Sequence, residues 1–210
     1  MINYEVMISL LSSNPIAFVI ATMGLVIAIT IHEAAHAFMA DYLGDPTPRA
    51  NGRTTLNPRA HLDPLGTLML LLFRFGWGKP VGFDPYNLKN PIRDTSLIAL
   101  AGPASNLLLA IFLAIFTKLL AVPVFFSTAV EWIIYLNVML AVFNLVPVHP
   151  LDGSKIILMF LPANTALEYE NFMHRYGMIV LVLLILPWGG TSPIQQLIWP
   201  VIQFIMNILS

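Results

Sequence analysis

Residues 16–43 read IAFVIATMGLVIAITIHEAAHAFMADYL, with no Asp, Glu, Lys or Arg before Glu33. This pattern predicts one helix of about 28 residues, or roughly 42 Å at 1.5 Å per residue, which is long enough to cross a bilayer and emerge from it. Gly44-Asp45-Pro46 follows and is predicted to end the helix. The sequence therefore places two histidines and a glutamate within a membrane helix.

The composition supports a membrane protein. The 210 residues are 58% apolar and 10% charged, whereas roughly a quarter of the residues in ordinary soluble domains are charged. A chain of this length cannot bury so many apolar side chains by folding alone in water. The formal net charge of -1 argues against a nucleic-acid partner, which would require clustered basic surface. Because the sequence contains no cysteine, it excludes disulfides, thiolate zinc ligands and a cysteine nucleophile.

Further apolar segments follow the first helix. Residues 95–120 and 124–146 are predicted to span the membrane, and residues 65–73 are predicted to form a short or re-entrant helix. Shorter apolar segments follow at 156–161, 176–187 and 194–209. The expected fold is an all-α membrane protein, a multi-pass helical bundle of five or six transmembrane or re-entrant segments.

Residues 45–64 differ from the rest, with four prolines and three arginines. They are predicted to form an irregular region or a small β-hairpin. Seven Lys and Arg residues lie between Arg49 and Arg93, which favours a cytoplasmic location for this stretch. We expect one domain over residues 1–210, with no PDZ or CBS domain and no removable signal peptide.

The HEAAH motif, residues 32–36, carries the main chemical signal. Histidines at i and i+4 lie about 40° apart around a helix and about 6 Å apart along it, so both imidazoles can bind one metal ion. Glu33 flanks that face, where a carboxylate can accept a proton from water. The alternative to a metal site is that the two histidines and the glutamate pack by chance in a polar bundle interior. Each ionisable group at membrane depth costs on the order of 2.5–3.5 kcal/mol, and a zinc site can offset that cost.

A catalytic zinc usually has three protein ligands. The candidates for the third ligand are aspartates and histidines from outside the motif, namely Asp41, Asp45, His61, Asp63, Asp84, Asp94, His149 and Asp152. Asp152 is preferred because it lies in NLVPVHPLDG, a polar, proline-interrupted segment between two apolar runs. The residues alone leave a second interpretation open, in which Asp152 is a helix N-cap at the surface.

HEAAH in a membrane helix, followed by NLVPVHPLDG at residues 144–153, resembles the site-2 protease family of intramembrane zinc metalloproteases. Gly102-Pro103-Ala104-Ser105-Asn106 is similar to the GPxxN element of that family, and Gly52–Thr67 is similar to the segment after its first active-site helix. The resemblance covers roughly residues 16–160, with several motifs in the expected order.

The resemblance implies one zinc ion per chain, bound by His32, His36 and Asp152, with Glu33 as the catalytic base. It implies that Asn144 holds the substrate backbone or polarises the scissile carbonyl. Capping of the broken backbone is the alternative for Asn144. Asn106 is a second candidate for substrate binding, with interhelical hydrogen bonding as its alternative. The implied partners are membrane lipid and transmembrane protein or peptide substrates.

The implied reaction is hydrolysis of peptide bonds in or near transmembrane segments, as in regulated intramembrane proteolysis. The expected location is the cell membrane, with the active site towards the cytoplasmic side. A membrane metal-ion transporter that uses the His/Glu/Asp cluster is the alternative, because intramembrane ionisable residues also mark ion pathways. Transport favours polar residues spread over several helices, whereas here they concentrate in one group. The sequence leaves the oligomeric state open.

Overall fold

The computed structural model describes residues 14–73, 77–120 and 123–210, and within these ranges the chain is mainly helical and contains no β-strand. The elements are α2 (Pro15–Leu43), α3 (Thr47–Ala50), α4 (Pro58–His61), α5 (Pro64–Phe73), η1 (Pro85–Asn87), α6 (Pro91–Leu119), α7 (Val124–Asn144), α8 (Gly153–Ile156), η2 (Ile157–Phe160), α9 (Ala163–Ile185) and α10 (Pro193–Leu209). The all-helical prediction is therefore confirmed for the part of the chain that the structure describes.

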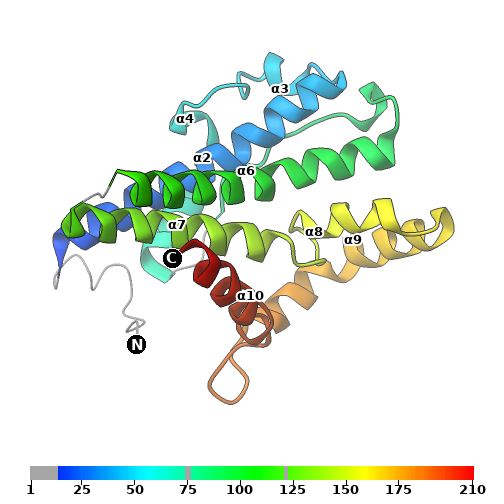
Figure 1. Cartoon of the computed structure of the whole chain (residues 1–210). Helices are drawn as coiled ribbons and strands as arrows, with labels where there is room; N and C mark the ends of the chain where they lie inside the picture. The colour runs from blue at the N-terminus through cyan, green and yellow to red at the C-terminus, as the bar shows by residue number, and fades with distance from the viewer. Residues whose placement is uncertain (1–13, 74–76, 121–122) are drawn as a thin grey trace.

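The centre of the molecule consists of α2, α6 and α7, which lie side by side and pack against one another in all three pairs (Figure 1). Small residues allow this close packing. A Cβ added at Gly24 of α2 would lie 3.1 Å from the side chains of Ile133 and Leu136 on α7. Ala28 and Ala110 are fully buried. Small residues at helix contacts are typical of membrane bundles, where close backbone approach provides much of the packing energy.

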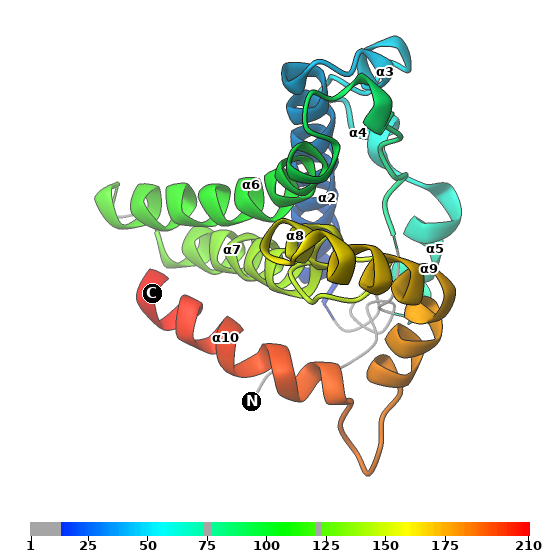
Figure 2. The same cartoon turned by 90° about the vertical axis from the view of Figure 1, so that its right-hand side faces the viewer.

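Within the described parts of the chain, three helices are long and apolar enough to cross a membrane: Pro15–Leu43, Pro91–Leu119 and Ser127–Asn144. They coincide with the three long spans predicted from the sequence. The larger number, five or six segments, is not confirmed. The helix α5 has only ten residues and α10 has 17, and α9 begins with the polar stretch ANTALEYENFMHRY. The connection between α9 and α10 projects away from the bundle (Figure 2).

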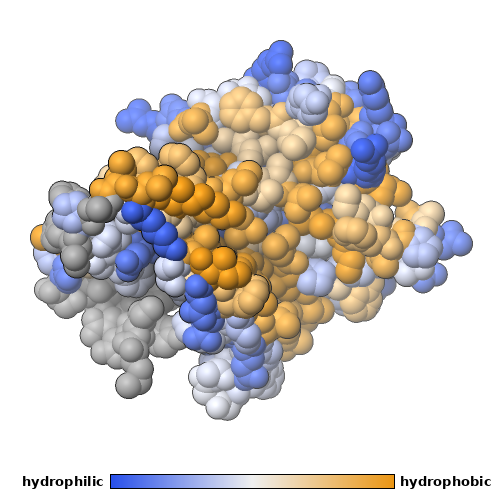
Figure 3. Space-filling view, viewed as in Figure 1, coloured by the Kyte–Doolittle hydropathy of each residue, from blue (hydrophilic) through white to orange (hydrophobic). Residues whose placement is uncertain are grey.

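The outer surface of the bundle is apolar. Large apolar side chains on α6 remain exposed, among them Leu108, Phe112 and Ile115. Hydrophobic residues cover much of the face seen in Figure 3, and hydrophilic residues gather towards its edges. Such a surface is costly in water and suits contact with lipid. The protein is therefore a membrane protein.

Residues 45–64, all of which the structure describes, do not form a β-hairpin. After Gly44 (φ 111°) ends α2 in the left-handed conformation, the chain forms the short helices α3 and α4, separated by turns. Pro48 and Pro58 lie in the first turns of these helices. Proline suits the first turn of a helix, but it lacks the N–H donor that a β ladder needs. One isolated bridge pairs Leu62 with Gly78.

Asp45 connects the end of α2 to the segment that precedes α6. Its carboxylate is fully buried and accepts hydrogen bonds from the Thr47 amide and hydroxyl at 3.1 and 2.6 Å. It also accepts from the Asp84 amide and the Asn87 side-chain amide, each at 2.8 Å. One carboxylate therefore fixes two segments that are 39 residues or more apart in sequence.

We expect Asp45→Ala to lower the free energy of unfolding by about 1–3 kcal/mol, because four donors lose a buried acceptor. Equilibrium unfolding in detergent micelles measures the change. Asp41→Ala is the matched control, since the Arg49 partner of Asp41 is 71% exposed and such pairs contribute about 0–1 kcal/mol. Equal losses in the two variants would show that Asp45 does not stabilise this connection.

Candidate metal centre

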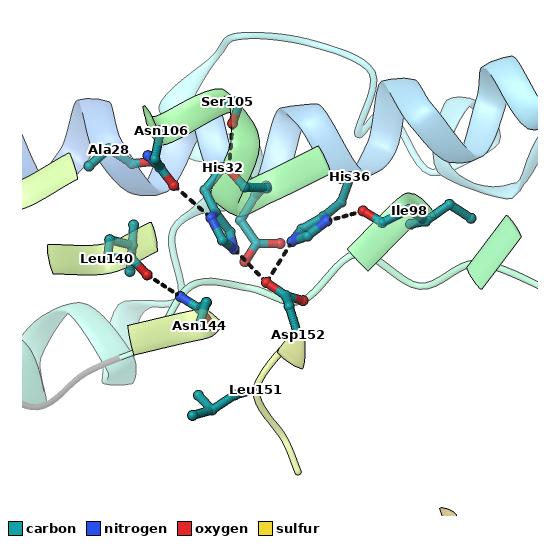
Figure 4. Close-up of polar contacts among 12 residues, drawn as sticks. Ala28, His32, His36, Ile98, Ser105, Asn106, Leu140, Asn144, Leu151 and Asp152 are labelled. Atoms are coloured by element: carbon teal, nitrogen blue, oxygen red, sulfur yellow. Dashed lines mark hydrogen bonds and ion pairs between the residues drawn. The ribbon is translucent and has the colours of Figure 1, made fainter. Parts of the chain in front are cut away.

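His32 and His36 lie one turn apart on α2, and Asp152 approaches both of them from the segment before α8 (Figure 4). The Oδ2 atom of Asp152 is 3.0 Å from His32 Nε2 and 3.3 Å from His36 Nε2. The imidazole rings are perpendicular, with centroids 4.6 Å apart. All three side chains are at least 85% shielded from solvent. Residues 120 positions apart in the sequence thus direct polar atoms to one point.

The remaining ring nitrogens determine the tautomer of each histidine. His36 Nδ1 lies 2.7 Å from the Ile98 carbonyl, which can only accept, so Nδ1 donates a proton. His32 Nδ1 lies 2.7 Å from Asn106 Oδ1. Because the Asn106 amide nitrogen donates to the Ala28 carbonyl and to Asn137 Oδ1, its oxygen accepts from His32. In the neutral rings, both Nε2 atoms therefore present lone pairs.

A divalent cation fits this arrangement. The two Nε2 atoms and a carboxylate oxygen lie within 4.8 Å of one another. Ligands about 2.0–2.1 Å from a tetrahedral zinc ion are roughly 3.3 Å apart, close to the observed separations of 3.0 and 3.3 Å. Three lone-pair donors that face one another repel unless a cation lies between them. Imidazole and carboxylate are also ligands that zinc commonly accepts.

The side chain of Asp152 makes no capping hydrogen bond to α8, which argues against the N-cap interpretation. Several other candidates for the third ligand have different partners. His61 Nε2 donates to the Thr55 carbonyl, and Asp94 accepts from the Asn90 amide. His149 stacks on His174, with ring centroids 5.5 Å apart. Among the described residues, His32, His36 and Asp152 form the one His/Asp/Glu group that could hold a metal ion.

Two glycines permit the close approach of the elements around this group. A Cβ at Gly102 of α6 would lie 2.5 Å from His36 Nε2 and 2.7 Å from His32 Cε1. A Cβ at Gly153 would lie 2.3 Å from the Leu145 carbonyl oxygen at the end of α7. Any side chain at these positions would force the helices apart. The glycines of Gly102-Pro103 and Asp152-Gly153 therefore permit close helix packing next to the candidate metal centre.

A cavity of about 520 Å³ lies beside the candidate ligands and is lined by Glu33 and Asn144. The Glu33 side chain is 14% exposed, and its Oε2 atom lies 3.9 Å from Arg53 Nη2. Asn144 donates from its amide nitrogen to the Leu140 carbonyl at 3.0 Å. Asn106 is fully buried and is not among the residues that line the cavity. Its observed contacts are interhelical.

The sequence interpretation missed two polar residues near this group. Asn137 is fully buried within α7 and accepts from Asn106 at 2.8 Å. Its signal was visible, because it is an amide in the middle of an apolar span. Arg53 is 5% exposed, donates to the carbonyls of Lys79 and Pro80, and approaches Glu33. No local signal identified Arg53, since its role depends on the path of residues 77–83.

The helical membrane fold and the buried His-His-Asp group with an adjacent glutamate define a class, the membrane metallopeptidases. The model of peptidase family M50 matches residues 121–186. A Bacillus subtilis protein named "Putative zinc metalloprotease YwhC" is 38% identical over 191 residues, which cover 85% of this chain and 84% of that protein. A Mycolicibacterium smegmatis protein named "Putative zinc metalloprotease Rip2" is 32% identical over 176 residues, covering 81% of this chain and 68% of that protein.

The chain belongs to peptidase family M50, the site-2 protease family. No solved structure matches it. Zinc is the cofactor that the family and the observed donor set support. The family is one of metallopeptidases, whose substrates are proteins.

We expect Gly102→Ala to reduce the zinc content of the purified protein to well below one ion per chain, because the new methyl group would overlap both imidazoles. Elemental analysis of protein in detergent measures zinc. Gly82→Ala is the matched control, since a Cβ there meets no atom within 4 Å. A full zinc content in Gly102→Ala would contradict the steric argument.

Proposed function

We propose that this protein is an intramembrane zinc endopeptidase that hydrolyses peptide bonds in or near transmembrane segments of membrane proteins, as in regulated intramembrane proteolysis. The observation that carries the proposal is the convergence of His32, His36 and Asp152 beside Glu33, in a cavity between apolar helices. Burial in a bundle of this hydropathy means that the scissile bond must reach the site from within or beside the bilayer.

In this proposal, His32, His36 and Asp152 hold the zinc ion. The hydrogen bonds to Asn106 and to the Ile98 carbonyl orient the two imidazoles and keep Nε2 free for the metal. When bound, zinc supplies Lewis-acid polarisation of the scissile carbonyl and lowers the pKa of water at the site. The protein contributes the fixed ligand geometry and a cavity that limits access of bulk water.

Glu33 is the proposed general base. Its carboxylate accepts a proton from the attacking water and then donates it to the amide nitrogen as the C–N bond breaks. The protons balance over this cycle, and Glu33 returns to its ionised form. The Arg53 guanidinium, with Nη2 3.9 Å from Glu33 Oε2, places a positive charge beside this carboxylate. Asn144 lines the same cavity, where its amide group can hold the backbone of an extended substrate.

We place the active site towards the cytoplasmic side of the membrane. The HEAAH motif lies in the C-terminal half of α2, which leads into the arginine-rich residues 45–64. The positive-inside rule favours the cytoplasm for this stretch. The transporter alternative is less well supported, because the buried polar side chains that connect His32 to α6 and α7 are the neutral amides of Asn106 and Asn137 rather than a series of ionisable groups.

We expect Glu33→Gln to lower kcat at least 100-fold while zinc stays near one ion per chain, because the amide cannot accept the proton and Glu33 is not a ligand in the proposal. Cleavage of a transmembrane peptide by the reconstituted protein gives the rate, and elemental analysis gives zinc. Glu131→Gln, which alters an exposed glutamate on α7, is the control. Retained cleavage in Glu33→Gln would exclude Glu33 as the base.

We expect Asn106→Ala to weaken zinc binding by about 10–100-fold, because His32 loses the acceptor that fixes its tautomer. Competition with a chelator of known affinity measures the change. Asn171→Ala on the exposed face of α9 is the control. A loss of thermal stability with unchanged zinc affinity would indicate that Asn106 acts through interhelical packing alone.

A further inference from the structure

Lys155 lines the cavity that contains Glu33 and Asp152. Among the described lining residues, it is the one lysine or arginine. The catalytic roles proposed above do not use it, and the resemblance to the family assigned it none. Its position nevertheless directs a positive charge into the space that a substrate would occupy.

The backbone at Lys155 is held firmly. The buried Ser96 hydroxyl of α6 donates to the Lys155 carbonyl at 2.7 Å. Two residues earlier, Gly153 packs directly against the backbone at the end of α7. The Lys155 amide itself donates to the Asp152 carbonyl at 2.9 Å. The side chain at position 155 therefore starts from a fixed point close to the candidate metal centre.

The ammonium group of Lys155 has an aromatic neighbour. Its Nζ lies 5.1 Å from the centroid of the Phe83 ring, a cation–π contact. None of the ion pairs among the described residues involves Lys155. Apart from the candidate metal ligands, Glu33 and Asn144, the other residues that line the cavity are apolar, including Leu25, Ile29 and Phe143. A half-buried ammonium group in such surroundings is stabilised when an anion enters the cavity.

We propose that Lys155 forms a subsite for a carboxylate of the substrate, supplied by an acidic side chain or by a free carboxyl terminus. The inference rests on the proposed function and specifies its substrate class. Phe83 holds the aliphatic stem and the ammonium group in place while the carboxylate accepts a charge-assisted hydrogen bond from Nζ. The enzyme then prefers peptides with an acidic group at a fixed distance from the cleaved bond.

The position of the subsite indicates which end of α2 it lies near. Phe83 packs on the cluster formed by Ala40, Leu88 and Ile98, at the C-terminal end of α2. Leu25 and Ile29 line the cavity further towards the N-terminus of the same helix. Lys155 therefore lies towards the end where α2 leaves the apolar region. The acidic group of the substrate should lie on this flank, where a carboxylate is also cheapest to place.

A series of single-span peptides tests the subsite. Asp, Asn or Lys is placed at successive positions on both sides of the cleaved bond, and the protein is reconstituted in phosphatidylcholine vesicles. We expect kcat/KM to favour Asp over Asn by roughly tenfold at one position or two adjacent ones, on one side only. Lys155→Gln should abolish that ratio. Lys155→Glu should reverse it, so that Lys is preferred over Asp at the same position. Lys89→Gln, at an exposed lysine outside the cavity, should keep the wild-type ratio.

Two further arms distinguish the sources of the anion. Peptides that end at the preferred position with a free carboxyl terminus or with an amide show whether a terminal carboxylate also binds. Vesicles with added anionic lipid show whether Lys155 instead responds to lipid head groups. Dependence of the Lys155 effect on lipid charge, with no dependence on peptide charge, would overturn the proposal.

A binding measurement separates this inference from the proposed function. Peptide affinity for Glu33→Gln, measured by fluorescence anisotropy, should fall roughly tenfold from Asp to Asn, and Lys155→Gln should remove the difference. Equal affinities and equal cleavage of Asp and Asn peptides at every position would refute the subsite while leaving the peptidase intact. Binding without cleavage of any peptide by the wild type would contradict the proposed function while retaining the subsite.

Discussion

The structure depends on the need to compensate polar groups inside an apolar bundle. His32, His36 and Asp152 are buried among helices whose outer surface suits lipid. Each such group is costly at membrane depth unless another group or a metal ion compensates it. The ring nitrogens bond to Asn106 and Ile98, and the opposite nitrogens face Asp152. The surrounding fold can be understood as the scaffold that brings these atoms together.

Close backbone approach makes this convergence possible. Gly102 lets α6 pass against both histidines, and Gly153 lets the turn after Asp152 rest on the end of α7. Asn106 and Asn137 then connect α2, α6 and α7 through buried amide hydrogen bonds. Buried amide networks specify one arrangement of helices when every member is paired. The same contacts therefore serve helix packing and the orientation of His32.

The sequence predicted the parts of the structure that depend on local pattern. The spans at α2, α6 and α7 follow from length and hydropathy, and the HEAAH spacing places two imidazoles on one helix face. Residues 45–64 were less predictable, because prolines are compatible with a loop, a hairpin or the first turn of a helix. The approach of Arg53 to Glu33 was not visible, because it depends on contacts of Arg53 with Lys79 and Pro80, 26 and 27 residues away.

The candidate metal centre and the cavity draw on different parts of the chain. The ligand atoms of His32, His36 and Asp152 come from α2 and from the turn before α8. Both of these elements pack against α6 and α7. The other walls of the cavity include Val81 and Phe83 of the segment before η1, Leu181 of α9 and Ile198 of α10. A catalytic centre requires its reacting groups to be fixed to within about 0.5 Å, whereas a binding cavity tolerates changes of shape. Substitutions in the outer walls can therefore alter which peptides fit without moving the histidines. Lys155 lies between the candidate metal centre and the outer cavity walls, because it follows Asp152 in the chain and its ammonium group contacts Phe83. It can therefore couple substrate selection to the catalytic centre.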